Sequence, residues 1–458
     1  MAISQKSLTA GQSAVGHAGG TGGVLFTDRR DFYIDPQVVK ELWTDVTPFT
    51  TVISNRETRQ TNDPLFKMFE HRNPWVKQYC VVNSDTDNLD SDGTTETSIT
   101  IDGYTNLSST PHDDKSYIGL VFDVWTDGYG TYKGQIVCTD TTSNTIIKTK
   151  SIKLSTGSDT ALADNDILLV VGNAHGEGTY APEPWYDELK VVWNSTQIFK
   201  TPLQVTGTLL QASLRGESSE LARLRVQKSQ EHKMQKERAF LFGKRFGGTG
   251  LGDSQNGTTD DSFADNGLVT VDSGVGAGNL IRTTYGMVSA LDDYGTTSGD
   301  YQNEFTISSS YSYGDFVDDM EKVFQYIPET GVKRAFCGAG ALGYWSKISG
   351  SDNMAGNSGW SVNIGDMKRD SLGFNYRVLE TPHGMLQLIP TPALRGPYNK
   401  YMVVVSEENM FHAQYRNPMY QTNIKTDNAF DGVKDQYFSD EGVGISLIDS
   451  HHLFKITA

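Results

Sequence analysis

One segment differs in character from the rest of the chain: residues 208–243 read TLLQASLRGESSELARLRVQKSQEHKMQKERAFLFG. The segment has no proline and one internal glycine, Gly216, and it is rich in residues that favour helices. Gly243 suits the position just after a helix end. The segment therefore predicts one continuous helix about 45–50 Å long, at 1.5 Å per residue. A helix of that length is expected to support several modules.

The same segment is unusually basic. Six cationic side chains fall within sixteen residues: Arg223, Arg225, Lys228, Lys233, Lys236 and Arg238. A solvated helix face is the ordinary explanation of such a run. The alternative is a surface that contacts phosphate groups or an acidic patch of another subunit. Both interpretations stay open at this point.

The flanking charge has the opposite sign. The 458 residues carry 39 Lys and Arg against 56 Asp and Glu, a net charge of −17, which excludes a uniformly basic nucleic-acid binder. Residues 81–190 hold 18 acids and 6 bases, and residues 251–310 hold 9 acids and 1 base, whereas residues 191–250 hold 4 acids and 10 bases. This division suggests surfaces that face different environments.

Several classes of protein are not expected. No run of about 18 apolar residues predicts a transmembrane helix, and the first residues, MAISQKSLTAGQSAVGHAGGTGG, lack the apolar region of a signal peptide. The three cysteines, Cys80, Cys138 and Cys337, are too few and too far apart for a disulfide framework or a CxxC metal site. We expect them to be reduced, in a protein made in a cytoplasm.

The remaining elements follow from periodicity. Residues 35–46 predict a helix that Pro48 ends, and residues 313–327 predict another, opened by a capping box at Ser312. The predicted strands are 99–101, 120–124, 167–171, 190–193, 197–199, 332–337, 376–379, 385–389 and 402–405, with a helix over 341–348. Residues 443–456 alternate like a strand, but the phase slips, which predicts a bulge or turn near 449–451.

Two motifs resemble ligand sites. Gly338, Gly340 and Gly343 match GxGxxG between a strand and a helix, but no βαβ repeat and no suitably placed acid follows, so a tight turn is favoured over a dinucleotide site. Asn88-x-Asp90-x-Asp92-Gly93 resembles the start of an EF-hand loop. Ile99 occupies the position that needs a bidentate Glu, so a solvated acidic loop is favoured over a cation site.

No catalytic or metal site is predicted. His451 and His452 are adjacent, and neighbours on a strand point to opposite faces, so they do not readily bind one metal. The sequence contains no HExxH, GxSxG or GxxxxGK[ST] motif. We expect no enzyme activity, no cofactor and no metal.

The order of these parts resembles the major capsid proteins of tailed bacteriophages, the Hong Kong 97-like fold family. The resemblance rests on the basic helix 208–243, on DFVDDMEKVFQYI and VKRAFCGAGALGYWSKI between 280 and 400, and on the closing segment from Tyr420 to Ile456. It implies an α+β fold with an axial domain, a peripheral domain, a long spine helix, an extended N-terminal arm and an E-loop, here with a β-rich insertion.

The resemblance also implies domain boundaries. Residues 1–60 correspond to the N-terminal arm, and residues 61–205 to the E-loop region with an acidic insertion at about 85–185. Residues 206–279 correspond to the spine helix and a peripheral loop, 280–400 to the axial domain, and 401–458 to the return to the peripheral domain.

The implied function is that of a major capsid protein in the virion. Hexamers and pentamers would self-assemble into an icosahedral head around double-stranded DNA, with a portal, a separate scaffolding protein and a decoration protein as partners. The six basic residues would then lie at the inner surface or between subunits, and the acidic insertion outside. The alternative is a secreted β-rich carbohydrate-active enzyme or adhesin, which leaves the basic helix unexplained. A nucleotide-dependent oxidoreductase rests on Gly338–Gly343 alone.

Overall fold

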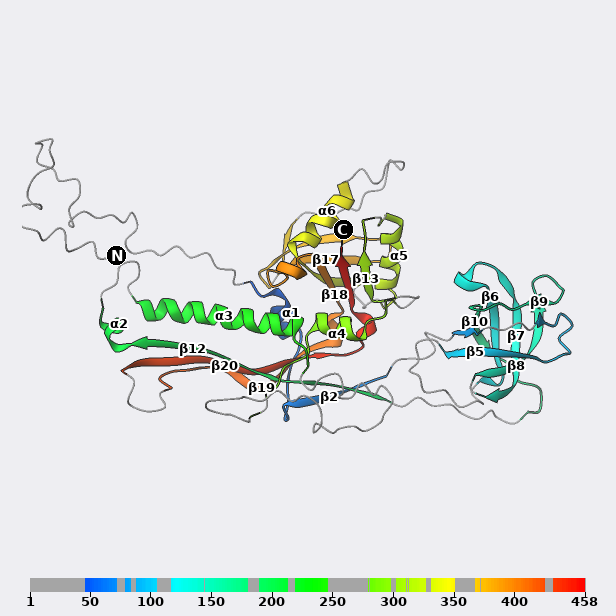
Figure 1. The fold of residues 1–458 in the computed structure, drawn as a ribbon, viewed down its shortest axis with the longest axis horizontal. Coiled ribbons are helices and arrows are strands. Elements are labelled where there is room, and N and C mark those ends of the chain that lie inside the picture. Colours follow the sequence, from blue (N-terminus) through cyan, green and yellow to red (C-terminus); the bar gives the residue numbers. More distant parts are fainter. Residues whose placement is uncertain are drawn as a thin grey trace, which may run out of the picture.

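The computed structural model describes residues 46–71, 79–83, 88–104, 117–143, 145–179, 189–212, 219–245, 279, 281–297, 302–309, 311, 313–326, 331–350, 367–370, 372–424 and 431–457. Residues 35–45 of the predicted helix 35–46 lie outside them, as does Ser312. Two larger sheets, a barrel and two two-stranded pairs make up the described β structure, and helices pack on the two larger sheets (Figure 1).

The first sheet has four strands in the order β1-β19-β20-β12, with β1 parallel to β19 and the other pairs antiparallel. Their bounds are β1 Thr58–Gln60, β12 Gln197–Thr206, β19 Met410–Gln421 and β20 Gly432–Ile445. Along β12 every second side chain is buried, including Phe199, Leu203 and Val205. One face of this four-stranded sheet is therefore covered, and the long helix α3 (Glu220–Phe242) lies along it (Figure 1).

The long helix is shorter than the predicted one. The short helix α2 (Gly207–Gln211) ends where Ala212 turns extended, and α3 begins anew at Ser219, whose hydroxyl accepts a hydrogen bond from the Ala222 amide. At 1.5 Å per residue, its 23 residues span about 35 Å. The prediction of one helix over 208–243 was therefore wrong at its N-terminal end, because a serine cap starts the helix eleven residues later.

The second sheet has seven strands in the order β13-β21-β18-β14-β17-β16-β15. Their bounds are β13 Glu304–Ile307, β14 Val332–Cys337, β15 Lys368–Arg369, β16 Asn375–Glu380, β17 Met385–Pro390, β18 Tyr401–Val405 and β21 His452–Ile456. Helices α5 (Tyr313–Val323) and α6 (Ala339–Gly350) pack on it, and α5 buries Phe316, Met320 and Val323 at helical spacing. The predicted strand 332–337 is confirmed residue for residue.

A second apolar cluster joins the two sheets. Helices α1 (Pro48–Arg56) and α4 (Met287–Tyr294) pack there with the end of α3, and they bury Phe49, Leu241 and Leu291. Pro48 stands in the first turn of α1, where its missing amide hydrogen is not needed. Pro48 therefore begins a helix that was not predicted, and residues 35–45 of the helix predicted before it lie outside the described ranges.

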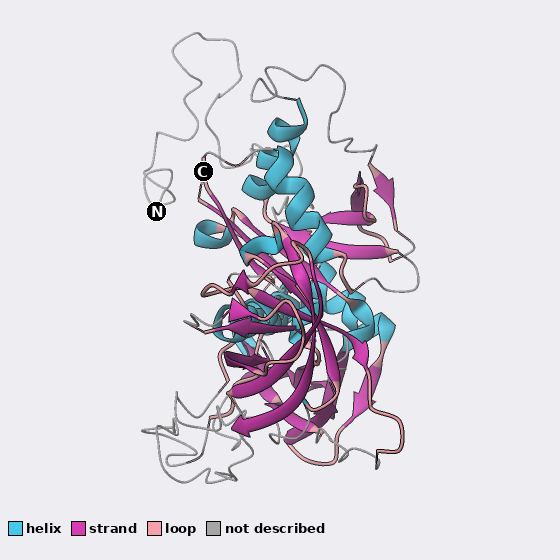
Figure 2. Ribbon diagram, turned by 90° about the vertical axis from the view of Figure 1, so that its right-hand side faces the viewer, coloured by secondary structure: helices cyan, strands magenta, loops and turns pink. Residues whose placement is uncertain are grey.

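The acidic insertion forms a closed barrel of six strands in the order β10-β3-β5-β8-β7-β6. Their bounds are β3 Tyr79–Val82, β5 Thr97–Tyr104, β6 Leu120–Trp125, β7 Tyr132–Ser143, β8 Ile146–Leu154 and β10 Ile167–Asn173, and β4 (Asn88–Leu89) pairs with β9 (Thr160–Ala161) beside it. In Figure 2 the barrel faces the viewer. Its interior is an apolar cluster formed by barrel residues alone, among them Phe122 and Ile136.

A two-stranded ribbon lies between the barrel and the four-stranded sheet in the sequence. It pairs β2 (Leu65–Glu70) with β11 (Lys190–Ser195) in antiparallel register. One face packs on the body through Phe66, which contacts Phe411 of β19. The other face carries Phe69 opposite Val191.

The predicted break near residues 449–451 is present, and it is larger than a bulge. Strand β20 ends at Ile445 in the four-stranded sheet, the 3₁₀ turn Ile448–Ser450 follows, and β21 lies in the seven-stranded sheet. The segment 401–458, expected to belong to one domain, therefore contributes strands to both sheets. The α+β class is as expected.

We predict that the barrel unfolds separately from the two sheets, because its core is its own. Phe122→Ala should destabilise the barrel by about 3–5 kcal/mol, as is typical of a buried Phe-to-Ala change. Differential scanning calorimetry should show one transition moved to lower temperature. Phe454→Ala, in the core of the seven-stranded sheet, is the matched control and should move a different transition. A single transition that both variants lower equally would contradict the prediction.

Candidate functional site

The long helix binds the four-stranded sheet through buried charges. Strand β20 carries Asp435, Asp440 and Glu441, all of them fully buried. A carboxylate taken out of water is costly unless it is paired with a cation. Two of these carboxylates, Asp435 and Glu441, bind cations of α3.

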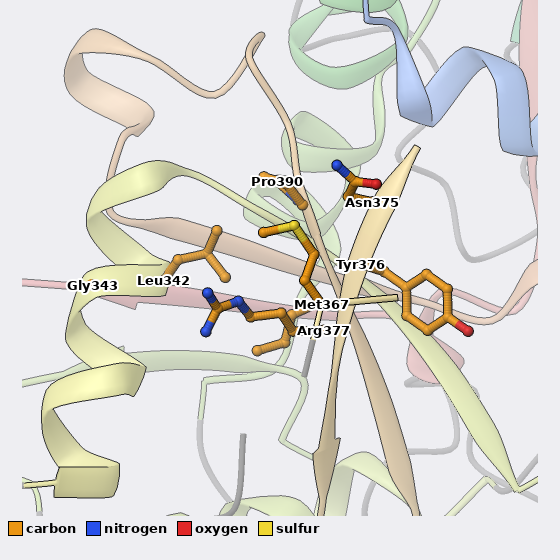
Figure 3. A pocket seen from close by; sticks show the side chains of 8 residues that line it. Leu342, Gly343, Met367, Asn375, Tyr376, Arg377 and Pro390 are labelled. Atoms are coloured by element: carbon orange, nitrogen blue, oxygen red, sulfur yellow. The ribbon is translucent and has the colours of Figure 1, made fainter. Parts of the chain in front are cut away.

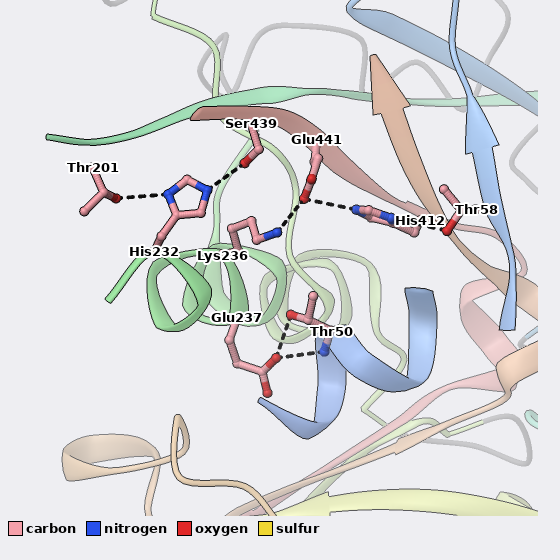
Figure 4. A network of polar contacts seen from close by, with 9 residues as sticks. All are labelled: Thr50, Thr58, Thr201, His232, Lys236, Glu237, His412, Ser439 and Glu441. Carbon is pink, nitrogen blue, oxygen red and sulfur yellow. Dashed lines mark hydrogen bonds and ion pairs between the residues drawn. The ribbon is translucent and has the colours of Figure 1, made fainter. Parts of the chain in front are cut away.

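Each pair has short contacts. Arg225 donates to Asp435 at 2.8 Å, and Lys236 lies 3.0 Å from a Glu441 oxygen that His412 also contacts at 3.2 Å (Figure 4). Burial opposes ionisation of both acids, but hydrogen bonds from Tyr420, the Asn423 amide and Arg225 hold the pKa of Asp435 below its usual value. His412 and Lys236 do the same for the pKa of Glu441.

A buried histidine stands between these two pairs. His232 of α3 lies 3.0 Å from the Thr201 hydroxyl of β12 and 3.0 Å from the Ser439 hydroxyl of β20 (Figure 4). Burial, together with the positive charge of Lys236, lowers the pKa of His232 to about 4. The ring is therefore neutral near pH 7, and α3 contacts the sheet through a row of hydrogen bonds and ion pairs.

The other side of α3 holds helix α1. The fully buried Glu237 carboxylate accepts hydrogen bonds from the Phe49 amide at 3.0 Å, the Thr50 amide at 2.7 Å and the Thr50 hydroxyl at 2.6 Å (Figure 4). Thr47, at the N-cap of α1, makes no side-chain cap of its own. Glu237 thus accepts hydrogen bonds from two amides at the start of α1 that have no partner within that helix, although it lies far away in the sequence.

The third buried carboxylate of β20 faces away from α3. The Asp440 carboxylate forms ion pairs with the guanidinium groups of Arg416, at 3.1 Å, and Arg282, at 3.5 Å. Arg416 also lies 4.4 Å from the centre of the Phe438 ring. Both faces of β20 are therefore held by charge pairs to other elements.

These contacts divide the six predicted basic residues. Arg223 and Lys228 pair with Glu220 and Glu231 on the helix surface, while Arg225 and Lys236 bind the sheet. Only Lys233 and Arg238 of the six are exposed and have no ion-pair partner within the described ranges. Most of the basic charge is thus used inside the subunit, a partition that spacing along the helix could not show.

The glycine motif is a packing device. A Cβ atom at Gly338 would lie 2.2 Å from the backbone carbonyl oxygen of Asn399, and one at Gly340 would lie 2.8 Å from the side-chain nitrogen of Asn399. The residues from Gly338 to Gly340 therefore allow the chain around Asn399 to approach, as the tight-turn interpretation requires. Beyond the turn, Leu342, Met367 and Arg377 border an apolar hollow of about 270 Å³ (Figure 3).

The carboxylates of the acidic loop, residues 88–96, accept hydrogen bonds from the loop's own residues. Asp90 accepts hydrogen bonds from the Asp92 amide at 3.1 Å and the Thr95 amide at 3.2 Å, and Asp92 accepts from Thr94. Hydrogen bonds from the Thr95 side chain and the Asp92 amide lower the pKa of Asp90 to about 2. Over the part of the chain that the structure describes, no three His, Cys, Asp or Glu side chains come together as metal ligands.

The sequence did not identify one exposed surface. On the outward face of the ribbon Phe69 is 74% exposed and Val191 is 50% exposed, next to Leu189 at 58%. Strand 190–193 was predicted, but its partner β2 was not. Exposed apolar side chains in such a group indicate a contact with another molecule.

The subunit thus combines a long helix bound across one sheet, a second sheet with its own helices, and a ribbon with an uncovered apolar face. The model of the SU10 major capsid protein family matches residues 36–443, and the chain belongs to that family. It is a phage major capsid protein, whose subunits assemble into the capsid of the virion.

Solved structures with similar folds are distant in sequence. The capsid of a native GTA particle is 9% identical, with 96% of this chain and 98% of that chain covered and a TM-score of 0.43. The structure from Mycobacterium phage Bobi is 8% identical, with 62% of this chain and 80% of that chain covered and a TM-score of 0.36. The mature capsid of bacteriophage PhiM1 is 8% identical, with 63% of this chain and 78% of that chain covered and a TM-score of 0.36.

No curated protein was found to match the chain. The family match does not support the alternative of a secreted carbohydrate-active enzyme or adhesin. None of the described helices combines the length and apolar character needed to cross a membrane.

We predict that the pair formed by Lys236 and Glu441 is needed to hold α3 on the sheet. Lys236→Met should destabilise the unassembled subunit by about 3 kcal/mol, because it leaves the Glu441 charge buried with one cation fewer. The double variant Lys236→Met/Glu441→Gln should recover much of this loss. Chemical denaturation measures both variants.

Lys233→Met, on the exposed side of the same helix, is the control and should stay within about 0.5 kcal/mol of the wild type. Equal effects of Lys236→Met and Lys233→Met would show that the buried pair contributes nothing specific.

Proposed function

We propose that this major capsid protein forms hexamers and pentamers of an icosahedral head around double-stranded DNA, and that it contributes binding surfaces and no catalytic step. The observation that carries the proposal is the apolar outward face of the ribbon. A two-stranded ribbon has no core of its own, so Phe69 and Val191 leave water only when another molecule covers them. A neighbouring subunit is the partner that a shell provides at every position.

The domain boundaries fit this proposal. Residues 61–205 act as an E-loop region whose ribbon contacts a neighbour and whose acidic barrel lies outside, away from DNA. We assign residues 1–60 to the N-terminal arm, whose last part, α1 and β1, packs into the subunit. Residues 206–279 contain the spine helix, 280–400 form most of the axial domain, and 401–458 complete both sheets. A portal, a separate scaffolding protein and a decoration protein are the further partners that we propose.

Assembly should depend on the ribbon face. Phe69→Ser should leave the stability of the subunit within about 0.5 kcal/mol of the wild type, because the side chain is mostly exposed. It should reduce shell formation at least several-fold, because the contact loses a buried aromatic anchor. Negative-stain electron microscopy and sedimentation of the purified protein measure both points.

Ile152→Ser is the matched control, since Ile152 is 53% exposed on the outside of the barrel. Wild-type protein that forms no shells or capsomers under any assembly condition would overturn the proposed function. Normal shells from Phe69→Ser would overturn the role of the ribbon face.

We propose that the two exposed cations of α3 face the packaged DNA. Lys233→Glu/Arg238→Glu should leave subunit stability and shell assembly nearly unchanged but lower the fraction of DNA-filled particles several-fold, because phosphate is then repelled. Lys150→Glu/Lys153→Glu on the barrel makes the same change in charge and should not lower it. Equal filling of the two variants would place Lys233 and Arg238 away from the DNA.

A further inference from the structure

Two chain segments cross between the sheets, and they are bonded to each other. The first, residues 406–409, joins β18 to β19, and the second, residues 446–451, joins β20 to β21. The Ser446 amide donates to the Asn409 carbonyl at 3.0 Å, and the Asn409 side chain donates to the Ser450 hydroxyl at 2.8 Å. We call these two segments the crossover pair.

A buried imidazole connects the same two segments. His451 is fully buried, its Nδ1 accepts a hydrogen bond from the Ser406 amide at 3.1 Å, and its Nε2 lies 3.3 Å from the Ser446 carbonyl oxygen. Lys333 of β14 adds a bond to the Ser450 carbonyl at 3.1 Å. The crossover pair is therefore a single hydrogen-bonded unit at a connection between the two sheets.

This unit contains one strained residue. Leu447 has φ 49° and ψ 64°, in the left-handed region. For a residue with a Cβ atom that conformation costs about 1–2 kcal/mol. Such an outlier persists only where the surroundings hold it.

The group that holds it comes from the ribbon. The Leu447 amide donates to a carboxylate oxygen of Glu70 at 2.5 Å, and Glu70, the last residue of β2, is buried. Glu70 and Phe69 are neighbours on one strand and point to opposite faces. Glu70 therefore faces the crossover pair from the same strand that carries the exposed Phe69 on its other face.

We propose that the contact between Glu70 and Leu447 is a latch that couples the position of the ribbon to the angle between the two sheets. While the ribbon is docked, Glu70 holds Leu447 in the left-handed conformation and the crossover pair keeps its shape. When a neighbouring subunit draws the ribbon away, Leu447 loses its acceptor and relaxes, and the bonds between the two segments loosen. The agent that moves the ribbon rests on the proposed function, whereas the coupling is a property of the single subunit.

Amide hydrogen exchange on the unassembled full chain tests the coupling. Glu70→Ala should speed exchange about tenfold at Ser406, Ser446 and His451, amides that Glu70 does not bind, as expected for the loss of a hydrogen bond to a charged group. Glu70→Gln, whose side-chain oxygen can still accept, should have a smaller effect. Glu70→Ala/Leu447→Gly should exchange more slowly at these amides than Glu70→Ala, because glycine adopts the left-handed conformation without the steric cost.

Lys67→Ala, an exposed position on the same strand, is the control and should match the wild type. Faster exchange confined to the Leu447 amide would overturn the proposal, because Glu70 would then hold one bond and nothing beyond it. If Glu70→Ala also speeds exchange in the core of α5, the substitution has destabilised the whole subunit. The comparison with Glu70→Ala/Leu447→Gly then decides whether Leu447 carries the coupling. Without recovery at Ser406 and Ser446 in that variant, the latch is overturned. The exchange measurement does not involve shell assembly. Failure of the latch proposal can therefore be told apart from failure of the proposed function.

Discussion

The structure depends on buried ion pairs between one helix and one strand. Over its 23 residues α3 fully buries few side chains, namely His232, Glu237, Phe240 and Leu241, and two of these four are polar. Its position is therefore set by directional contacts, in which Arg225 binds Asp435 and Lys236 binds Glu441. Such pairs add little net stability, because desolvation offsets the attraction, but a displaced helix would leave charges buried and unpaired. The helix is thus held in one place, and the surfaces of the subunit are held with it.

Apolar packing acts elsewhere and in separate units. The barrel, the seven-stranded sheet and the junction of α1, α3 and α4 each have their own cluster of buried side chains. Polar contacts add to this packing at three places: Glu237 caps α1, His451 joins the crossover pair, and Glu70 holds Leu447. Hydrogen bonds can be exchanged between alternative partners more readily than a close-packed core can be rebuilt. Under the proposed assembly of hexamers and pentamers, this distribution would let the subunit take slightly different shapes.

Prediction from the sequence succeeded where a pattern was local. Strand 332–337, the amphipathic helix from 313, the glycine turn at 338–340 and the break near 449–451 all follow from short-range periodicity or from glycine. The two longest barrel strands, β7 and β8, were missed, because their exposed positions are filled by Thr, Ser and Lys, which also suit loops. The start of α3 was misplaced, because good helix formers continue upstream of the Ser219 cap.

By itself, the sequence determined the kind and order of many elements, the opposite charge of neighbouring segments and, through the resemblance they carry, the capsid class. These properties are encoded in residues close together along the chain, where helical and strand periodicity act. Only the tertiary structure decided which charges are available to a partner. Arg225 and Lys233 look alike in the sequence, yet one binds a carboxylate 210 residues away and the other is exposed. Long-range pairing places Asp435, Glu441 and Glu70, and a buried carboxylate selects its cation by distance in space, which spacing along the chain does not record.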